Sequence, residues 1–267
     1  MTFGTERTMR IALGIEYSGE RYCGWQRQKH SPSVQENLDN VLKKIADQSI
    51  KTFCAGRTDT GVHASGQVLH FDIDNPRPIS AWLRGANNQL PSDIAVKWAV
   101  EVNDNFHARF SAIKRSYRYV IYNSETPSAI LAGKVTWHRR PLDVNLMQAG
   151  ANELIGKHDF SSFQASSCQA NTSIRNITAL KLSQRGKFIF IDITANAFLH
   201  HMVRNIVGTL LWIGEGRQPP KFMKQTLHEL DRTKAPDTAK PTGLYLVRVE
   251  YPAEFLLPTE TTLPLEY

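Results

Sequence analysis

The chain has 267 residues, 41% of them apolar and 21% charged, so it can bury a core and is too apolar for a wholly disordered chain. It carries 32 lysines and arginines against 25 aspartates and glutamates, and this net charge of +7 points only weakly to a polyanionic partner. No apolar run reaches the roughly 18 residues of a membrane span, and the N-terminal residues lack the apolar stretch and cleavage site of a signal peptide.

The cysteines indicate the cellular compartment. Cys23, Cys54 and Cys168 lie far apart in the sequence and form no CxxC pair. Their odd number and wide spacing argue against a disulfide framework and against a zinc site built on thiolates. We therefore expect a cytoplasmic protein with reduced cysteines.

The positive charge is unevenly distributed along the chain. Residues 250–267 contain four glutamates and neither lysine nor arginine, so residues 1–249 carry +11. Residues 105–140 alone carry +6, and aromatic residues alternate with basic ones in Lys114-Arg-Ser-Tyr-Arg-Tyr119. This mixture suits a nucleic acid, whose phosphates attract cations and whose bases stack on rings. A strand with charged outward side chains would have the same composition, so both interpretations stay open.

The first half of the chain predicts elements in the order βαββαβ. Apolar residues alternate along each strand, whereas they recur at helical spacing after the capping box Ser33-Val-Gln-Glu36. A second helix begins near Ser80 and ends before Pro91. The predicted strands are 10–17, 51–55, 67–73 and 94–102, and the predicted helices are 34–45 and 79–90.

The second half predicts the same order with one added helix. Asp143 caps a helix over 143–155, Gln184-Arg-Gly186 joins two strands as a hairpin, and Gly214 follows a helix over 198–213. The remaining predicted elements are strands 114–123, 174–183, 187–196 and 243–251 and the added helix 221–230.

Each half matches the split βαβ, ferredoxin-like arrangement, in which antiparallel strands pack one face against two helices. We predict an α+β fold with an N-terminal half over 9–104 and a C-terminal half over 105–251. Residues 1–8 show no pattern and are expected to form a flexible N-terminus. Residues 252–267 form an acidic, proline-containing tail that we expect to be mobile, although its apolar Phe255-Leu-Leu257 could dock on the surface.

Several common catalytic motifs are absent from the sequence, including the phosphate-binding GxxxxGK[ST] and GxGxxG loops and the HExxH and GxSxG motifs. His200 and His201 are neighbours near a predicted helix start. They point in different directions and would make poor joint metal ligands, so we expect them to serve in polar packing or RNA contact.

One glycine-punctuated loop combines opposite charges. The segment Ala55-Gly-Arg-Thr-Asp-Thr-Gly-Val-His-Ala64 lies between two predicted strands and places the carboxylate of Asp59 near the guanidinium of Arg57. From spacing alone, the simpler interpretation is a turn in which Asp59 bonds its own backbone. A catalytic loop is the alternative interpretation.

The predicted helix from Phe198 provides a second cation. Arg204 lies on a polar stripe with His200 and Gly208, opposite a strongly apolar stripe. An arginine in the middle of such a helix is either solvated or paired with a carboxylate, which the sequence does not identify.

Six segments in chain order carry a resemblance to a known family. They are Gly24-Trp-Gln-Arg-Gln28, Ala55-Gly-Arg-Thr-Asp-Thr-Gly-Val-His-Ala64, Arg115-Ser-Tyr-Arg-Tyr119, Asp159-Phe-Ser-Ser-Phe163, Phe198-Leu-His-His-Met-Val-Arg-Asn-Ile206 and Gly243-Leu-Tyr-Leu246. Together they resemble the tRNA pseudouridine synthase A (TruA) family over about residues 10–251. The Arg-Thr-Asp loop followed by Gly-Val-His-Ala is highly specific in that company.

The resemblance implies an isomerase that converts uridine to pseudouridine at positions 38–40 of the tRNA anticodon stem-loop. It implies neither a metal nor a cofactor. It also implies a homodimer whose two similar βαββαβ halves share one extended, mainly antiparallel sheet. The element order predicted from the sequence agrees with that fold.

The resemblance also assigns roles to individual residues. The aspartate of the family's Arg-Thr-Asp motif is the catalytic carboxylate, which corresponds to Asp59. Tyr117 corresponds to the tyrosine that lies against the target base, and Arg57 to the arginine that helps hold the nucleotide outside the stack. Arg204 corresponds to a helical arginine that pairs with the catalytic aspartate.

The implied reaction breaks the N1–C1′ bond, turns the uracil and joins C5 to C1′. A carboxylate can trap C1′, add to C6 or abstract a ribose proton, and the sequence does not choose among these routes. Each route needs Asp59 ionised, which a nearby Arg204 would favour. A base outside the stack needs a ring such as Tyr117, whose hydroxyl is a candidate for removing the C5 proton.

Two alternatives from other functional classes remain. A non-catalytic module on the same scaffold could bind or fold RNA. A small-molecule enzyme on a ferredoxin-like fold would show no loss of affinity with added salt, unlike an RNA-binding protein.

Overall fold

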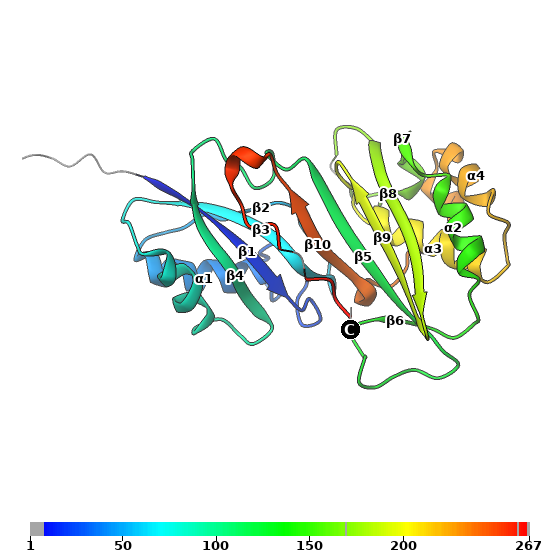
Figure 1. The fold of residues 1–267 in the computed structure, drawn as a ribbon, viewed down its shortest axis with the longest axis horizontal. Coiled ribbons are helices and arrows are strands. Elements are labelled where there is room, and N and C mark those ends of the chain that lie inside the picture. The colour runs from blue at the N-terminus through cyan, green and yellow to red at the C-terminus, as the bar shows by residue number, and fades with distance from the viewer. Residues whose placement is uncertain (1–7, 169, 261, 266–267) are drawn as a thin grey trace, which may run out of the picture. The chain divides into compact units, whose positions relative to one another are not determined.

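A computed structural model describes residues 8–168, 170–260 and 262–265, so the N-terminus expected to be flexible lies almost entirely outside the described residues. The described residues contain ten strands of one mostly antiparallel sheet together with several helices (Figure 1), which confirms the predicted α+β class. Two compact units are present. Unit 1 comprises the described residues of Met1–Ile113 and Leu246–Tyr267, and unit 2 comprises those of Lys114–Tyr245.

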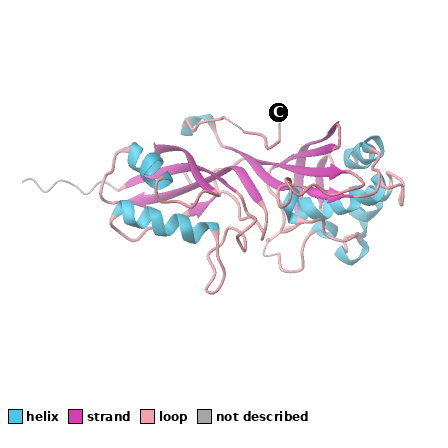
Figure 2. Ribbon diagram, turned by 90° about the horizontal axis from the view of Figure 1, so that it is seen from below, coloured by secondary structure: helices cyan, strands magenta, loops and turns pink. Residues whose placement is uncertain are grey.

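Unit 1 contains an antiparallel group of strands in the order β4-β1-β3, with the short β2 paired to β3. Its elements are β1 (Met9–Tyr17), α1 (Val34–Ala46), β2 (Phe53–Cys54), β3 (His63–Ile73), the π-helical turn η1 (Ala81–Gly85), β4 (Ile94–Val102), most of β10 (Leu244–Glu250) and the 3-10 turn η5 (Ala253–Phe255). In each unit the helices lie against the strands of that unit (Figure 2).

The predicted elements of unit 1 form for the reasons given by their sequences. Ile11, Leu13 and Ile15 of β1 are completely buried, as their alternation predicts. The helix α1 begins after Ser33, whose hydroxyl oxygen accepts a hydrogen bond from the backbone N–H of Glu36. Sequence periodicity therefore located both the core strand and the start of the helix.

The second predicted helix is shorter than 79–90 and contains the π-helical turn η1. Helical backbone ends at residue 87, where the side chain of Asn87 both accepts from the N–H and donates to the C=O of Val96 in β4. Trp82 of η1 is fully buried, with its ring centroid 5.0 Å from that of Phe71. These long-range contacts end the helix before the position that Pro91 predicts.

The C-terminal tail, expected to be mobile, is packed on unit 1 over much of its described length. The rings of Tyr251 and Phe255 each lie 5.1 Å from that of Phe106, and Leu257 packs against the same cluster. Further along, the hydroxyl of Ser65 donates a hydrogen bond to the carbonyl of Thr262. Docking of the apolar tail residues therefore replaces the mobile tail that we expected.

Unit 2 has the antiparallel strand order β5-β9-β8-β7, with the short β6 parallel to β5. Its elements are β5 (Lys114–Asn123), β6 (Thr136–His138), α2 (Val144–Asn152), β7 (Gly156–Asp159), β8 (Ile174–Arg185), β9 (Phe188–Ala195), α3 (Met202–Gly214) and α4 (Phe222–Glu229), with 3-10 turns at Ser161–Phe163, Arg232–Lys234 and Pro241–Gly243. As predicted, Asp143 caps α2 by accepting from two backbone N–H groups. The three- and four-residue strands β6 and β7 are too short to show a period in sequence.

The helix α3 begins four residues after its predicted start at residue 198. His201 has a left-handed backbone with φ of 62°, which cannot continue a right-handed helix, so α3 starts at Met202. Arg204 therefore lies in the first turn of α3 and not in the middle of a helix. The division into units also differs from the sequence-based boundary, because residues 105–113 and 246–251 belong to unit 1.

The longest described helices, α1 and α3, have only 13 residues each, and none of the described helices has both the length and the apolar character needed to cross a bilayer.

Candidate functional site

The Asp59 loop of unit 1 connects β2 to β3 and is held in place by Thr58. The Thr58 side chain is buried, and its hydroxyl lies 2.7 Å from the phenolic oxygen of Tyr17 at the end of β1. Its carbonyl accepts a hydrogen bond from the N–H of Trp25. Asp59 follows directly as a half-buried residue, while Arg57 is exposed. The loop thus presents both charged residues from an anchored backbone.

Gly24 allows the two N-terminal motifs to approach each other. Its φ is +91°, and a Cβ atom at this position would lie only 2.6 Å from the carbonyl oxygen of Thr58. Only glycine tolerates both this backbone conformation and this separation. The segment beginning at Gly24 and the Asp59 loop are therefore one packed structure, although more than 30 residues separate them in sequence.

The backbone of the loop forms a turn, whereas the predicted bond from the Asp59 side chain to its own backbone stays a prediction. The N–H of Val62 donates to the carbonyl of Asp59, and Gly61 has a φ of +76°. The following His63 is buried, and its Nδ1 accepts a hydrogen bond from the backbone of Gly19. His63 therefore anchors the far end of the loop, a role that its place in the Gly-Val-His-Ala motif did not reveal.

Unit 2 holds Tyr117 and Arg204. Tyr117 lies on β5 opposite Ile193 of β9 and is buried, with its ring edge-to-face against Phe198 at 5.0 Å. Arg204 is half-buried. Its Nε donates to the carbonyl of Ala239, and its own carbonyl accepts from the N–H of the same residue. Two hydrogen bonds to one residue fix both the backbone and the side chain of Arg204.

Tyr119 links the two residues of unit 2. Side chains two positions apart on a strand share a face, so Tyr119 and Tyr117 point to the same side of β5. Burial raises the pKa of the Tyr119 phenol, whereas its hydrogen bond to Thr136 and the positive charge of Arg204 act in the opposite direction. The charge of Arg204 therefore acts on the phenol of Tyr119, which lies on the same face of β5 as Tyr117.

The contacts of Arg118 and Arg140 bear on the two interpretations of the basic segment 105–140. Arg118 is only 5% exposed and forms a two-pronged ion pair with Asp192 of β9, at 2.7 and 2.8 Å. Its guanidinium also lies 5.0 Å from the ring centroid of Phe190. Arg140 pairs with the mostly buried Glu215 at 2.8 Å. These two basic residues therefore form ion pairs within unit 2, although Arg118 is buried and not an outward strand residue, and Arg140 lies outside the strands.

The four predicted site residues thus fall into two groups, one in each unit. Asp59 and Arg57 share the anchored loop of unit 1. Tyr117 and Arg204 share unit 2, one on β5 and the other in the first turn of α3. The positioning residues Tyr17, Trp25 and His63 were missed as site residues, because they act through residues distant in sequence.

Comparison with known proteins identifies the family. A family model described as tRNA pseudouridine synthase matches residues 14–111 and 151–252. The tRNA pseudouridine synthase A of Hydrogenovibrio crunogenus is 55% identical over 248 residues, covering 93% of this chain and 95% of that protein. The protein of the same name from Aeromonas hydrophila is 54% identical over 257 residues, covering 96% of each.

Solved structures show a weaker likeness. A chain in the crystal structure of a Cbf5-Nop10-Gar1 complex aligns with 88% of this chain and 48% of its own length, at 11% identity and a TM-score of 0.39. A likeness of this size adds nothing to the assignment. The family model, which matches most of the chain, and the relatives, which match nearly its whole length, confirm the resemblance found in the motifs, and the chain belongs to the tRNA pseudouridine synthase A family.

Proposed function

We propose that this chain isomerises uridine to pseudouridine at positions 38–40 of the tRNA anticodon stem-loop, with Asp59 as the catalytic carboxylate. Membership of the family supports the reaction and the tRNA substrate. The observation that carries the assignment of Asp59 is the anchoring of its neighbour Thr58 through both side chain and backbone. Such anchoring limits the motion of the carboxylate, which favours reaction from one geometry.

Asp59 acts in its ionised form in this proposal. The carboxylate attacks C1′, adds to C6 of the uracil or removes a ribose proton, and the three routes share the same final bond from C5 to C1′. The family resemblance assigns Arg204 the role of partner to the catalytic aspartate, and its planar guanidinium group suits the orientation of a carboxylate. Arg57 holds the displaced nucleotide, since an exposed guanidinium on the same loop suits a phosphate.

Tyr117 receives the target base in this proposal. Its ring is already held edge-to-face by Phe198, so little conformational entropy is lost when a base stacks on it. A base that leaves the helical stack needs such a surface. The hydroxyl of Tyr117 is also our candidate for the group that removes the C5 proton at the end of the reaction.

A tritium-release assay tests the function. Transfer RNA labelled with tritium at uracil C5 loses the label when C5 bonds to C1′. The intact chain should release tritium, and Asp59→Ala should release none while binding the RNA with similar affinity. If the intact chain binds the anticodon stem-loop without releasing tritium, it is the alternative, a non-catalytic RNA-binding or RNA-folding module. Affinity that does not fall with added salt would instead point to a small-molecule enzyme.

The proposed enzyme acts as a homodimer in the cytoplasm. The three cysteines are free thiols, as the reducing cytoplasm favours. Sedimentation equilibrium of the full chain tests the dimer, which should have twice the chain mass of 30.2 kDa.

A further inference from the structure

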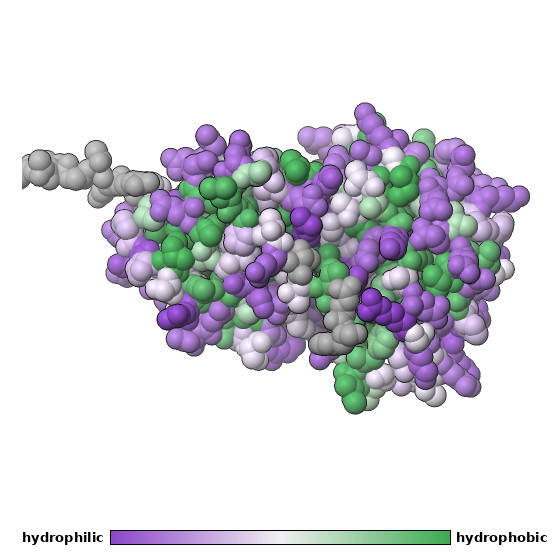
Figure 3. Space-filling view, in the orientation of Figure 1, coloured by the Kyte–Doolittle hydropathy of each residue, from purple (hydrophilic) through white to green (hydrophobic). Residues whose placement is uncertain are grey.

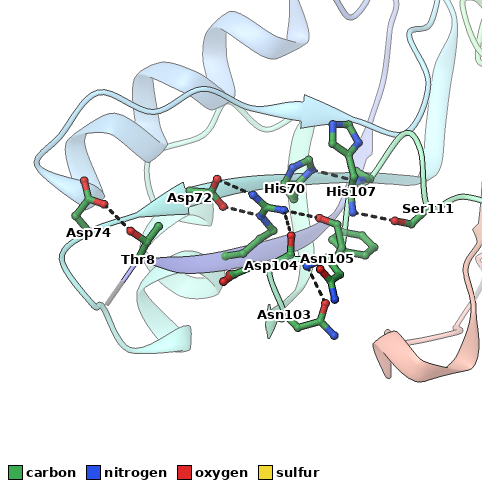
Figure 4. Close-up of polar contacts among 12 residues, drawn as sticks. Thr8, His70, Asp72, Asp74, Asn103, Asp104, Asn105, His107 and Ser111 are labelled. Atoms are coloured by element: carbon green, nitrogen blue, oxygen red, sulfur yellow. Dashed lines mark hydrogen bonds and ion pairs between the residues drawn. The ribbon is translucent and has the colours of Figure 1, made fainter. Parts of the chain in front are cut away.

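The loop between β4 and β5, residues 103–113 of unit 1, has no part in the proposed mechanism and is anchored to the strands of that unit. Arg10 of β1 forms a two-pronged ion pair with Asp72 and donates to the carbonyls of Asp104 and Phe106. Phe106, a residue of the loop itself, is fully buried. Figure 4 shows His70 of β3 facing the loop segment that carries His107 and Ser111. There, His70 Nδ1 accepts from the backbone N–H of Ala108.

The loop extends a series of aromatic rings to the surface. The rings of Phe53 and His70 are stacked at 5.1 Å, His70 and His107 lie 4.6 Å apart, and His107 and Phe110 lie 4.4 Å apart. The backbone N–H of Phe110 donates to His107 Nδ1, which holds this last residue against the series. Phe110 is nevertheless 76% exposed. We call these four residues the aromatic series.

A basic side chain lies at each end of the aromatic series. The guanidinium of Arg109 lies 5.6 Å from the centre of the Phe110 ring, and the amine of Lys51 lies 5.1 Å from that of Phe53. Burial raises the pKa of the Cys54 thiol to about 12, and the charges of Arg57 and Arg109 both oppose this rise. Cys54 follows Phe53 directly in sequence and shortly precedes the Asp59 loop, so the chain itself connects the aromatic series to that loop.

The two histidines contribute rings and not charge. Burial lowers the pKa of His70 to about 4, with help from His107 and Arg10, and burial and Arg10 lower the pKa of His107 as well.

Single exposed apolar side chains are common on proteins and carry no function by themselves. Phe110 differs because it is held by its neighbours and lies beside cations, the combination with which proteins bind unpaired nucleotides.

We propose that Phe110 stacks on an unpaired base of the RNA substrate while Arg109 binds an adjacent phosphate. This inference rests on the proposed function, because that function identifies the RNA partner as an anticodon stem-loop. The contact is a positioning one: it holds a nucleotide other than the one that Asp59 acts on. It should therefore affect RNA affinity and KM, and leave kcat almost unchanged.

Substitutions of Phe110 test the stacking. RNA affinity is measured by fluorescence anisotropy with an end-labelled anticodon stem-loop. Phe110→Ala should weaken binding about 5- to 150-fold, the range for loss of one stacked base. Phe110→Trp should restore affinity and Phe110→Leu should not, because leucine retains apolar area without an aromatic face. Apolar side chains gather at the projecting tip of the segment between β5 and β6 (Figure 3). Ile130→Ala, at an 87% exposed position in the sequence between these two strands, is the control and should bind normally.

An abasic scan identifies the nucleotide. Each loop nucleotide of the RNA is replaced in turn by an abasic one. One position should weaken binding to the wild-type chain but not to Phe110→Ala, because its stacking partner is already absent. Arg109→Gln should reduce the slope of log affinity against log salt concentration by about 0.7, because one phosphate contact is lost. Arg84→Gln, in the exposed part of η1, is the matched control.

Wild-type affinity in Phe110→Ala, or an abasic profile that Phe110→Ala leaves unchanged, would overturn the inference. Its failure is distinguishable from failure of the proposed function. Binding that depends on Phe110 without any tritium release would overturn the function and keep the inference. Normal tritium release with an unchanged KM in Phe110→Ala would do the reverse.

Discussion

The hydroxyl groups of Tyr17 and Thr58 lie 2.7 Å apart in the interior of unit 1, 41 residues apart in sequence. The first residue ends β1, and the second precedes the proposed catalytic Asp59. This hydrogen bond connects a core strand directly to the candidate catalytic loop. The position of the carboxylate therefore depends on the packing of unit 1 as well as on the loop itself.

Removing the Tyr17 hydroxyl should weaken this connection. Tyr17→Phe leaves the buried Thr58 hydroxyl without this partner, which should lower the free energy of unfolding by about 1–3 kcal/mol. Turnover should fall more in kcat than in KM, because the RNA surface is unchanged. Urea unfolding and steady-state tritium release provide the two measurements. The double variant with Thr58→Val should cost less than the sum of the single variants; additive losses would count against the bond.

A methyl group at Gly24 should displace the Asp59 loop. Gly24→Ala combines a φ of +91° with a Cβ only 2.6 Å from the Thr58 carbonyl, so we expect several kcal/mol of destabilisation and large loss of activity. Gly186→Ala is the control, since its φ is +56° and no atom lies within 4 Å of the added Cβ. It should cost only about 1 kcal/mol. Equal losses of thermal stability in both variants would show that backbone strain alone is responsible.

Removing the Asp59 carboxylate should abolish catalysis while leaving the fold intact. Asp59→Asn preserves side-chain size, and we expect tritium release to fall by at least about a thousandfold with RNA affinity changed less than about threefold. Circular dichroism checks folding. Residual turnover within tenfold of wild type would remove Asp59 from the catalytic role.

Arg204 should couple to Asp59 in activity. Arg204→Ala removes the hydrogen bond to the Ala239 carbonyl and should cost about 1–2 kcal/mol of stability, in addition to a large fall in turnover. Arg204→Lys retains the charge but not the planar donor group, so it should restore stability better than activity. In Asp59→Asn, the further change Arg204→Ala should have little additional effect on turnover. A full additive loss would indicate independent roles.

Stability should rise with pH between about 4 and 6.5. His70 has a folded pKa lowered to about 4 against 6.5 in the unfolded chain, so the unfolded state binds the extra proton in this window. The stabilisation, up to about 3 kcal/mol, is present above pH 6.5 and is lost as the pH falls towards 4. His70→Asn retains an acceptor for the Ala108 N–H without titrating, and should flatten the slope in urea unfolding. The exposed His30→Gln is the control and should leave the slope unchanged.

Local sequence determined most of the elements and the family. The alternation of Ile11, Leu13 and Ile15 and the cap at Ser33 depend on neighbouring residues only, so both were predicted correctly. The motif around Arg57 and Asp59 carried the family resemblance, because chemistry there requires particular residue types in a fixed local order.

Tertiary structure decided the features that join distant residues. The backbone of His201 delays α3 until Met202. Phe106 contacts the C-terminal tail, and the buried Arg118 forms an ion pair with Asp192, 74 residues away in sequence. None of these follows from a local period, since each depends on which surfaces meet after folding. The same reason places Gly24 and Tyr17 beneath the Asp59 loop: the motif identified the carboxylate, and only packing showed what holds it.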